Sequence, residues 1–249
     1  MKITAIIAAK NEGQSIRKVV DVTTQYVDEC IVVVPISDMN TREPLIGSDC
    51  RIVNETAKGK GSALLTGAQV ATGDILLFID ADLSHDPRDI PHLVAPIVNG
   101  DCDHVVASRM LGGSSELYDS LANFIRLIGS HIITLAINLK FGSKLTDSQN
   151  GYRAIRRDVF LSLDLQETHT TIEQELTAKT LSRGYRMIEL PSHEYSRVYG
   201  ESKINVFKHG PRYVMVLIRI LTSRKNQSTN HDYAIELQKK YRYAWYLKS

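Results

Sequence analysis

The sequence predicts an α/β fold in which a mostly parallel central sheet carries helices on both faces. Two observations support this fold class. Short apolar runs alternate with helical patterns through the first half of the chain, and this alternation favours a doubly wound parallel sheet. The runs are apolar at nearly every position, as expected of strands that helices cover on both faces. Ligands of such sheets bind beyond the carboxyl ends of the strands, so polar residues that end a strand are candidates for a site.

The first half of the chain predicts five strands and three helices. The strands are runs of β-branched and other apolar residues, expected at residues 3–9, 30–36, 50–54, 74–80 and 103–108. The helices show apolar residues at helical spacing, and they are expected at residues 15–27, 61–71 and 88–99.

The second half predicts longer helices and one more strand. Helices are expected at residues 123–142 and 171–184, the second with Thr170 or Thr171 as its N-cap and Gly184 as its stop. A strand follows at residues 185–191, and residues 223–249 form a polar linker and a basic, aromatic helix. We therefore expect one domain over residues 1–212 and a C-terminal tail over residues 213–249.

Composition excludes several classes of protein. The chain has 249 residues with 43% hydrophobic and 23% charged residues, which is ordinary for a soluble globular protein. A net charge of +2 argues against nucleic acid as a partner. Three scattered cysteines suit a reducing compartment without disulfides or a zinc site. Because we find neither a secretory signal nor about 18 consecutive apolar residues, we expect a cytoplasmic protein.

An acidic turn ends the predicted strand at residues 74–80. The strand runs into Asp80-Ala81-Asp82, where two carboxylates can converge on one hard cation such as Mg²⁺. Two carboxylates this close are costly to ionise together unless a cation neutralises them. The alternative is a capping turn, in which Asp82 or Ser84 caps the next helix.

Other charged residues follow neighbouring strands at the same edge of the sheet. Lys10 and Glu12 come after the first strand, and Arg109 after the fifth. Lys60 lies in a Gly-Lys-Gly lead into a helix, and a helix N-terminus is an anion site, although the P-loop spacing is absent. Acids for a metal and bases for phosphates are thus predicted to gather at one edge.

Six segments together resemble a known family. In order they are AAKNE, GKGSALLTGAQVATGDILLFIDADLSHDP, ASRMLGG, TDSQNGYRAIRRDVF, IEQELTAKTLSRGYRMIELP and RVYGESK. They resemble the motifs of family 2 glycosyltransferases with the GT-A fold, most of all the polyprenyl-phosphate sugar transferases that make dolichyl-phosphate mannose or glucose. The resemblance covers about residues 1 to 210.

The resemblance implies a site for a nucleotide-diphosphate sugar and a divalent metal. The metal, Mg²⁺ or Mn²⁺, would be held by Asp80, Asp82 and Ser84. The nucleotide-sugar residues would be Ala8, Lys10, Glu12, Lys60, Asp80, Ala81, Asp82, Arg197 and Lys203. Arg197 and Lys203 match a loop that closes over the diphosphate. One departure is that Val34 and Pro35 stand where the family usually has two acids, with Asp38 a few residues later.

A polar stripe marks the long helix predicted at residues 123–142. Asn123, Arg126, Ser130, Thr134 and Asn138 recur every three or four residues on an otherwise apolar helix. One interpretation is a buried helix with hydrogen-bonded polar groups, and the other is a helix at a membrane surface. In the synthases, matching Arg and Ser residues bind the acceptor phosphate together with the Arg of the SR motif, which implies that role for Arg126, Ser130 and Arg109.

The resemblance also suggests catalytic residues, namely Asp82, Arg109 and Asp147. Asp147 lies where other family 2 enzymes often have their base, but an anionic lipid phosphate needs positioning more than deprotonation. Arg153 is either a diphosphate or acceptor contact or a surface residue paired with Asp147 or Asp158.

The resemblance implies inverting transfer of a hexose from a GDP-mannose or UDP-glucose type donor to a polyprenyl phosphate. The enzyme would be peripheral on the cytoplasmic face of a membrane. Its tail would contact the membrane or a protein, or pack on the domain. The alternatives are a family 2 transferase with a soluble hydroxyl acceptor, which a working base at Asp147 would favour, and a non-catalytic nucleotide-sugar-binding subunit.

Overall fold

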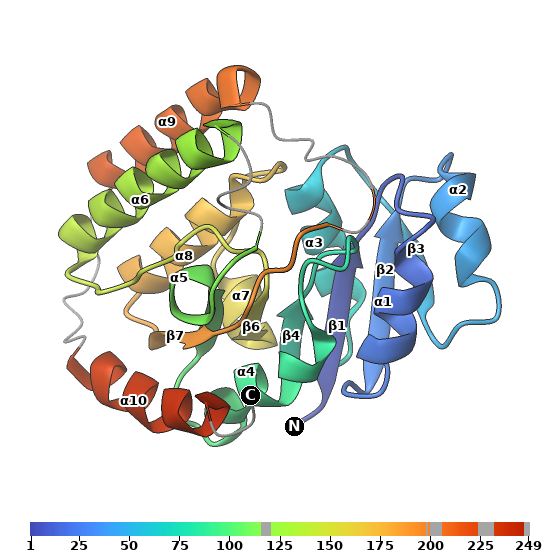
Figure 1. The fold of residues 1–249 in the computed structure, drawn as a ribbon, viewed down its shortest axis with the longest axis horizontal. Helices are drawn as coiled ribbons and strands as arrows, with labels where there is room; N and C mark the ends of the chain where they lie inside the picture. Colours follow the sequence, from blue (N-terminus) through green and yellow to red (C-terminus); the bar gives the residue numbers. More distant parts are fainter. Residues whose placement is uncertain (116–120, 198, 200–205, 224–231, 247–249) are drawn as a thin grey trace.

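A seven-stranded sheet forms the centre of the computed structural model, which describes residues 1–115, 121–197, 199, 206–223 and 232–246 (Figure 1). The strand order is β3-β2-β1-β4-β6-β5-β7, and every neighbouring pair is parallel except the two that involve β6. The strands are β1 Ile3–Ala8, β2 Glu29–Val34, β3 Arg51–Asn54, β4 Ile75–Phe78, β5 His104–Ser108, β6 Arg153–Arg156 and β7 Met187–Pro191. The predicted mostly parallel sheet is confirmed.

Helices cover both faces of the sheet, as predicted. They are α1 Ile16–Thr23, α2 Met39–Arg42, α3 Lys60–Val70, α4 Ile90–Val98, α5 Arg109–Gly112, α6 Leu121–Phe141, α7 Arg157–Ser162, α8 Ile172–Ser182, α9 Val206–Thr222 and α10 Asp232–Tyr246, with short 3-10 helices at Glu43–Leu45 and Pro87–Asp89. Helices α1, α4 and α10 pack on one face, and α3, α7 and α8 on the other.

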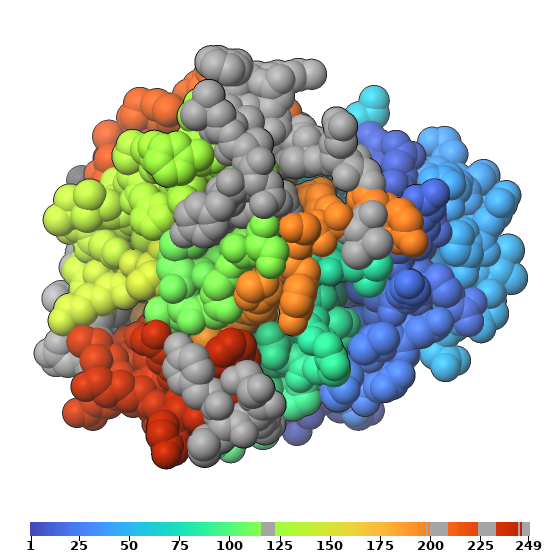
Figure 2. All heavy atoms as spheres, in the orientation of Figure 1, coloured from blue at the N-terminus to red at the C-terminus, as the bar shows by residue number. Residues whose placement is uncertain are grey.

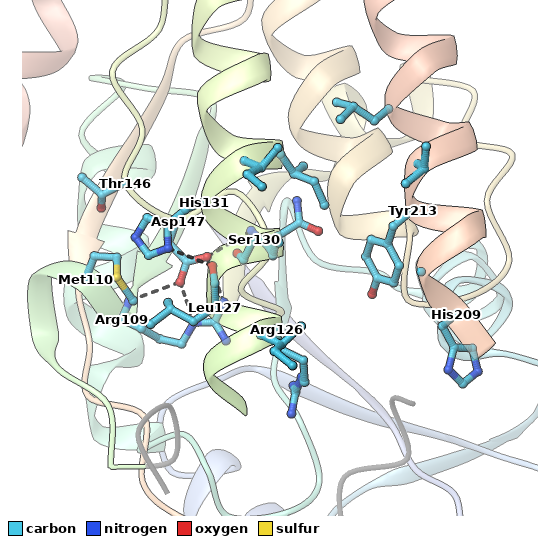
Figure 3. A pocket seen from close by; sticks show the side chains of 18 residues that line it. Arg109, Met110, Arg126, Leu127, Ser130, His131, Thr146, Asp147, His209 and Tyr213 are labelled. Atoms are coloured by element: carbon cyan, nitrogen blue, oxygen red, sulfur yellow. Dashed lines mark hydrogen bonds and ion pairs between the residues drawn. The ribbon is translucent and has the colours of Figure 1, made fainter. Parts of the chain in front are cut away.

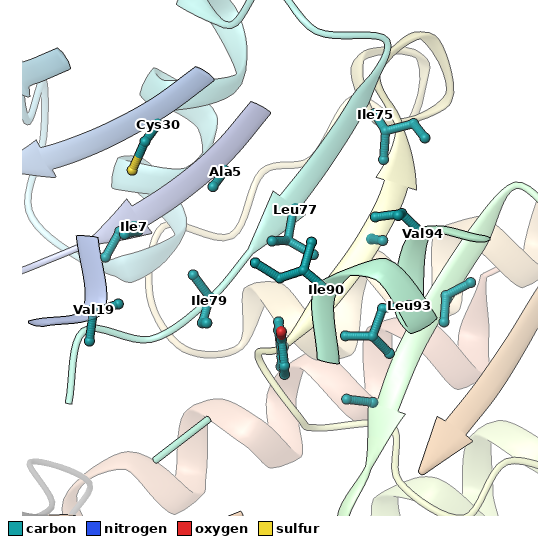
Figure 4. Close-up of a cluster of buried hydrophobic side chains, with 14 of the residues drawn as sticks. Ala5, Ile7, Val19, Cys30, Ile75, Leu77, Ile79, Ile90, Leu93 and Val94 are labelled. Atoms are coloured by element: carbon teal, nitrogen blue, oxygen red, sulfur yellow. The ribbon is translucent and has the colours of Figure 1, made fainter. Parts of the chain in front are cut away.

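Successive residues of β1 show why the strands are apolar throughout. Ala5 and Ile7 belong to the core cluster drawn in Figure 4, together with Val19 of α1 and Leu93 of α4. Ile6, between them, belongs to the cluster on the opposite face. Because side chains alternate along a strand and both faces are covered, these three residues are all fully buried.

Strand β6 was missed by the sequence analysis, and it places a loop at the site. It runs antiparallel between β4 and β5, so its first residue, Arg153, lies at the edge where the parallel strands end. Residues 147–151 lead into it and therefore reach that edge. A four-residue strand with arginine at both ends does not have the apolar pattern of the other strands.

Helices α6 and α9 lie side by side at one end of the molecule (Figure 1). The expectation that no stretch is apolar enough to span a membrane was wrong, since Asn123–Phe141 passes by length and composition. Only 17% of that window is buried, so α6 is not a core helix. The predicted boundary at residue 212 falls within α9.

The C-terminal helix α10 packs against the domain. The hydroxyl of Tyr233 accepts a hydrogen bond from the backbone N–H of Met187 at the start of β7, at 3.1 Å. The hydroxyl of Tyr241 contacts Asn99 and Asp101 beside α4. This arrangement matches the alternative in which the tail helix packs on its own domain, and it places α10 over β7, the last strand of the sheet.

Candidate active site

The acidic turn lies directly beyond the carboxyl end of β4, as predicted. One oxygen of Asp82 accepts hydrogen bonds from the backbone N–H of Ser84 at 3.1 Å and from its hydroxyl at 2.6 Å. The other oxygen lies 3.2 Å from the Arg197 guanidinium. The next helix is instead capped by Asp86, which accepts the N–H of Arg88 at 2.9 Å. The capping alternative for Asp82 and Ser84 therefore does not describe this turn.

Asp80 is ionised and faces a lysine. Its carboxylate lies 2.6 Å from the ammonium of Lys60 and 3.8 Å from Nε2 of His85. Burial opposes ionisation, but the charge of Lys60 outweighs it and lowers the pKa of Asp80 to about 2.

The turn fits a divalent cation that also binds substrate oxygens. Asp80 and Asp82 offer carboxylate oxygens, and the described residues contain no group of three or more His, Cys, Asp or Glu that could hold a metal. Mg²⁺ is commonly held by one or two carboxylates and completed by substrate phosphates. Lys60 and Arg197 supply the compensating positive charge in this structure.

The Gly-Lys-Gly lead into α3 has a packing explanation. Gly59 has a φ of +120° and approaches the backbone carbonyl of Thr168 so closely that a Cβ would lie 2.3 Å from its oxygen. Gly61 meets the carbonyl of Glu167 in the same way, at 2.2 Å. The glycines thus allow close contact with residues 167–168, and the contact holds Lys60 beside the acidic turn.

The loop after β1 is held by Asp38. Asn11, with a φ of +55°, donates its N–H to Asp38 at 2.7 Å, and Asp38 also accepts from the hydroxyl of Thr41 at 2.7 Å. Asp38 therefore fixes the loop that carries Lys10 and Glu12, while Ala8 is the last residue of β1. The acid that follows the departure at Val34-Pro35 has a structural role here.

Arg109 and Asp147 form a buried bidentate pair. The Nε of Arg109 lies 2.6 Å from one carboxylate oxygen of Asp147, and its Nη2 lies 3.0 Å from the other. Nη1 of Arg109 also reaches Glu194 at 3.4 Å. Burial opposes ionisation of Asp147, but Arg109 outweighs it and lowers the pKa of that carboxyl. With both oxygens held by a cation, Asp147 is a poor general base.

Glu189 of β7 holds the backbone that carries Asp147, and the sequence analysis missed this residue. Its two oxygens accept the backbone N–H groups of Asp147 at 2.6 Å and Thr146 at 2.7 Å. Burial raises the pKa of Glu189 to about 8. The only available signal was an acid within an otherwise apolar strand.

Arg153 is neither a substrate contact nor a surface residue, so both sequence interpretations were wrong. It is 1% exposed. Its guanidinium donates to the carbonyls of Asn150 and Ser148, each at 2.6 Å, and to the hydroxyl of Thr177 at 2.7 Å. Arg153 therefore fixes the shape of the loop before β6.

A cavity of about 320 Å³ is lined by α6 and α9, and Arg109 and Asp147 also line it (Figure 3). Arg126 and Ser130 of α6 line it together with Tyr213 of α9. The structure thus brings the three predicted acceptor-phosphate residues to one cavity. Much of the remaining lining is apolar, namely Met110, Ile125, Leu127, Ile132, Ile133, Val214 and Leu217.

The polar stripe of α6 has two different parts. Its first half, with Arg126 and Ser130, faces the cavity. In its second half, Thr134 is buried and hydrogen bonded to Ser148 at 2.8 Å, and Asn138 binds the backbone of Leu145. The interpretation of a buried helix with hydrogen-bonded polar groups therefore describes the second half of the stripe.

The segment after β7 crosses the acidic turn. The N–H of Tyr195 binds the carbonyl of Ser84 at 2.9 Å, and Arg197 reaches Asp82. In Figure 2 this orange segment lies against the teal surface of the N-terminal half. Lys203, the other residue predicted on this loop, lies outside the described residues.

Comparison with known proteins identifies related sequences. Residues 4–163 match the model of the family described as glycosyl transferase family 2. The chain is 27% identical over 219 residues to a dolichol-phosphate mannosyltransferase of Pyrococcus furiosus, covering 82% of this chain and 59% of that one. It is 31% identical over 162 residues to an undecaprenyl-phosphate mannosyltransferase of Micrococcus luteus, covering 62% and 64%.

A third relative and a solved structure extend the comparison. The low-salt glycan biosynthesis hexosyltransferase Agl6 of Haloferax volcanii is 25% identical over 188 residues, covering 76% of this chain and 45% of that one. The chain thus spans 45–64% of the length of these three relatives. The fold is similar to glucosyl-3-phosphoglycerate synthase from Mycobacterium tuberculosis, solved with Mn²⁺ and UDP, with a TM-score of 0.70, 22% identity, and coverage of 90% and 81%.

Proposed function

The chain belongs to glycosyl transferase family 2, and on that premise we propose that it transfers a hexose from a nucleotide-diphosphate sugar to a polyprenyl phosphate. The cavity between α6 and α9 is the observation that carries the proposal. A polyprenyl phosphate has an anionic head and a long apolar tail. The cavity offers Arg126, Ser130 and Arg109 for the head, and apolar walls for the first part of the tail.

The exposed surface beside the cavity supports a lipid acceptor. Six large apolar side chains of α6 are exposed, namely Phe124, Ile125, Ile128, Ile132, Leu135 and Leu139. Four follow on α9, namely Val214, Met215, Ile218 and Leu221. An exposed apolar surface of this extent is typical of membrane or protein contacts. We infer that the pair α6–α9 contacts the cytoplasmic face of a membrane, so that the lipid tail enters the cavity from the bilayer.

The acidic turn supports a nucleotide-sugar donor. Asp80 and Asp82 would hold Mg²⁺ or Mn²⁺, with Ser84 fixing the orientation of Asp82. A bound divalent cation would neutralise the charge that develops on the leaving nucleoside diphosphate. Arg197, already at the turn, would then contact the diphosphate, and the same role is proposed for Lys203. The donor would be of the GDP-mannose or UDP-glucose type, its base and ribose contacting the loop with Lys10 and Glu12.

The proposed reaction needs positioning rather than a general base. A phosphate oxygen of the acceptor forms a bond to the anomeric carbon while the bond from that carbon to the diphosphate breaks, which inverts its configuration. The acceptor is already anionic, so no proton has to be removed. This matches the state of Asp147, whose two oxygens are held by Arg109. The same state disfavours a hydroxyl acceptor with Asp147 as its base.

Radiolabelled transfer tests the proposal. The protein is incubated with Mn²⁺ and each of several UDP- and GDP-sugars, with either a short polyprenyl phosphate or the matching polyprenol. We expect label in the organic phase with the phosphate only. Arg126→Ala should raise the KM for the lipid phosphate at least about tenfold, the scale of one lost charge-assisted contact. The exposed Arg88→Ala serves as the matched control. Label on the polyprenol, or on neither lipid, would reject the proposal.

A further inference from the structure

A buried carboxylate at the start of α8 has one oxygen that the proposed function has not used. Glu173 is 4% exposed. Its Oε1 lies 2.9 Å from the ammonium of Lys60, which also lies 2.6 Å from Asp80. Its Oε2 has no hydrogen-bond partner among the described residues. Buried polar atoms are nearly always satisfied in native proteins, so Oε2 points to a ligand.

The position of Glu173 at a helix N-terminus does not explain this oxygen. A favourable helix dipole accounts for an acid in the first turn, and Glu175 occupies the same turn. Glu175, however, accepts the backbone N–H groups of Gln166 and Glu167 and pairs with Lys179. Of these two acids, Glu173 is the one that keeps an oxygen without a partner among the described residues.

Glu173 lies between the acidic turn and the cavity. Lys60 connects it to Asp80 on one side. The neighbour of Glu173 on α8, Gln174, donates a hydrogen bond to the carbonyl of Tyr213 at 3.4 Å, and Tyr213 lines the cavity across from α6 (Figure 3). Burial first, and then the negative charge of Glu173, raises the pKa of the Tyr213 phenol. A sugar that passes from a diphosphate at the turn to a phosphate in the cavity must occupy the space between them.

Gly151, in the loop before β6, lies close to the Lys60 ammonium and the Asp80 carboxylate. A Cβ on Gly151 would lie 2.5 Å from the ammonium of Lys60 and 3.2 Å from Oδ2 of Asp80. Any side chain here would displace the end of Lys60. The close approach therefore requires glycine at this point of the loop before β6.

We propose that Glu173 and Lys60 form the binding site for hydroxyl groups of the transferred hexose. A sugar hydroxyl both donates and accepts hydrogen bonds. Oε2 of Glu173 accepts from one hydroxyl, and Lys60, whose ammonium has three donors, donates to an adjacent oxygen. The two residues act as positioning and specificity-determining groups, and the inference rests on the proposed function.

Paired binding measurements test this inference without turnover. Calorimetry with Mn²⁺ gives dissociation constants for UDP, UDP-glucose, GDP and GDP-mannose, with no lipid present. For each pair, the dissociation constant of the nucleotide is divided by that of the nucleotide sugar. This ratio measures how much the hexose contributes to binding affinity. We expect Glu173→Gln to lower this ratio about tenfold, because a charged acceptor becomes a neutral amide, while nucleotide binding stays within about twofold. The matched control is Glu175→Gln, the same change two residues along α8, which should keep the ratio of the unchanged protein.

A second variant covers the case in which Glu173→Gln fails to fold. Gly151→Ala displaces the Lys60 ammonium, and it should also lower the ratio while nucleotide binding persists. The inference is overturned if the variant that folds has the same ratio as the original protein. It is also overturned if the original protein has a ratio of one for both pairs. Neither outcome overturns the proposed function. If the unchanged protein binds none of the four ligands, the proposed function falls as well.

Discussion

Replacing Asp147 with asparagine distinguishes two roles for this residue, namely a structural partner of Arg109 and a general base. The substitution keeps the shape of the side chain and one acceptor oxygen but removes the charge that neutralises Arg109. Removing one partner of a buried pair costs about 3–5 kcal/mol. Because Asp147 is 2% exposed and bidentate, and asparagine retains one contact, we expect a loss of about 3 kcal/mol. For a chain of this size the midpoint of thermal unfolding should fall by roughly 6–12 °C.

The pH dependence of this contribution has a definite sign. The pKa of Asp147 is lower in the folded protein than its unfolded value. The stabilisation by the pair is therefore present above the unfolded pKa, about 3.9, and is lost as the pH falls through the folded pKa. At neutral pH the full loss should be measured, whereas at strongly acidic pH the variant and the unchanged protein should converge.

Thermal unfolding and initial rates are measured on the same preparations. The rates are measured well below the midpoints of thermal unfolding of both proteins. The matched control is Asp158→Asn, which alters a surface pair with Arg156 and should cost less than about 1 kcal/mol. Transfer by Asp147→Asn should show a higher KM for the lipid phosphate and a kcat within about tenfold. Loss of a general base lowers the rate about 10²–10⁴-fold. Unchanged stability together with such a fall in kcat would refute the structural interpretation.

Three further predictions concern the metal, a buried acid and the membrane face. The guanidinium of Arg197 lies 3.2 Å from Asp82 and therefore competes with a metal ion for that carboxylate. Without nucleotide, Arg197→Gln should bind Mn²⁺ severalfold more tightly, as measured by electron paramagnetic resonance, and weaker binding would contradict this competition. Burial raises the pKa of Glu189 to about 8, above its unfolded value of about 4.3, so its contribution is present below pH 4.3 and is lost as the pH rises through 8. Urea unfolding from pH 4 to pH 9 should show a shallower decline for Glu189→Gln, and an equal slope would reject that pKa. Leu139→Glu, on the exposed face of α6, should weaken flotation with liposomes while Ile36→Glu, exposed elsewhere, should not, and equal effects would count against this membrane face.

The parallel strands could be predicted from the sequence because helices cover both faces of the sheet. Ile6 and Ile7 face opposite layers, so an uninterrupted apolar run identified β1 and its parallel neighbours. Strand β6 lacked that signal, since the buried guanidinium of Arg153 is satisfied by the carbonyl groups of Ser148 and Asn150 and by the hydroxyl of Thr177. A pattern of apolar residues contains no information about such contacts.

The candidate site was predictable in location but not in its pairings. Residues that follow parallel strands share one edge of the sheet, and Asp80, Asp82 and Arg109 lie beyond the carboxyl ends of β4 and β5. The partners of these residues come from distant parts of the chain. Asp147 lies 38 residues beyond Arg109, and Glu173 is far from Lys60, so their contacts depend on the order of the strands. That order is not visible in local spacing.

The position of β6 has a consequence for the order of folding. Strands β4 and β5 follow one another in the chain but are not neighbours in the sheet, because β6 lies between them. During synthesis, β4 therefore has an unpaired edge until residues 153–156 have emerged. Exposed edges of this kind pair readily with other chains. We expect nascent or truncated chains that end before residue 153 to aggregate, whereas chains that include β6 close the sheet and set the 147–151 loop in the same step.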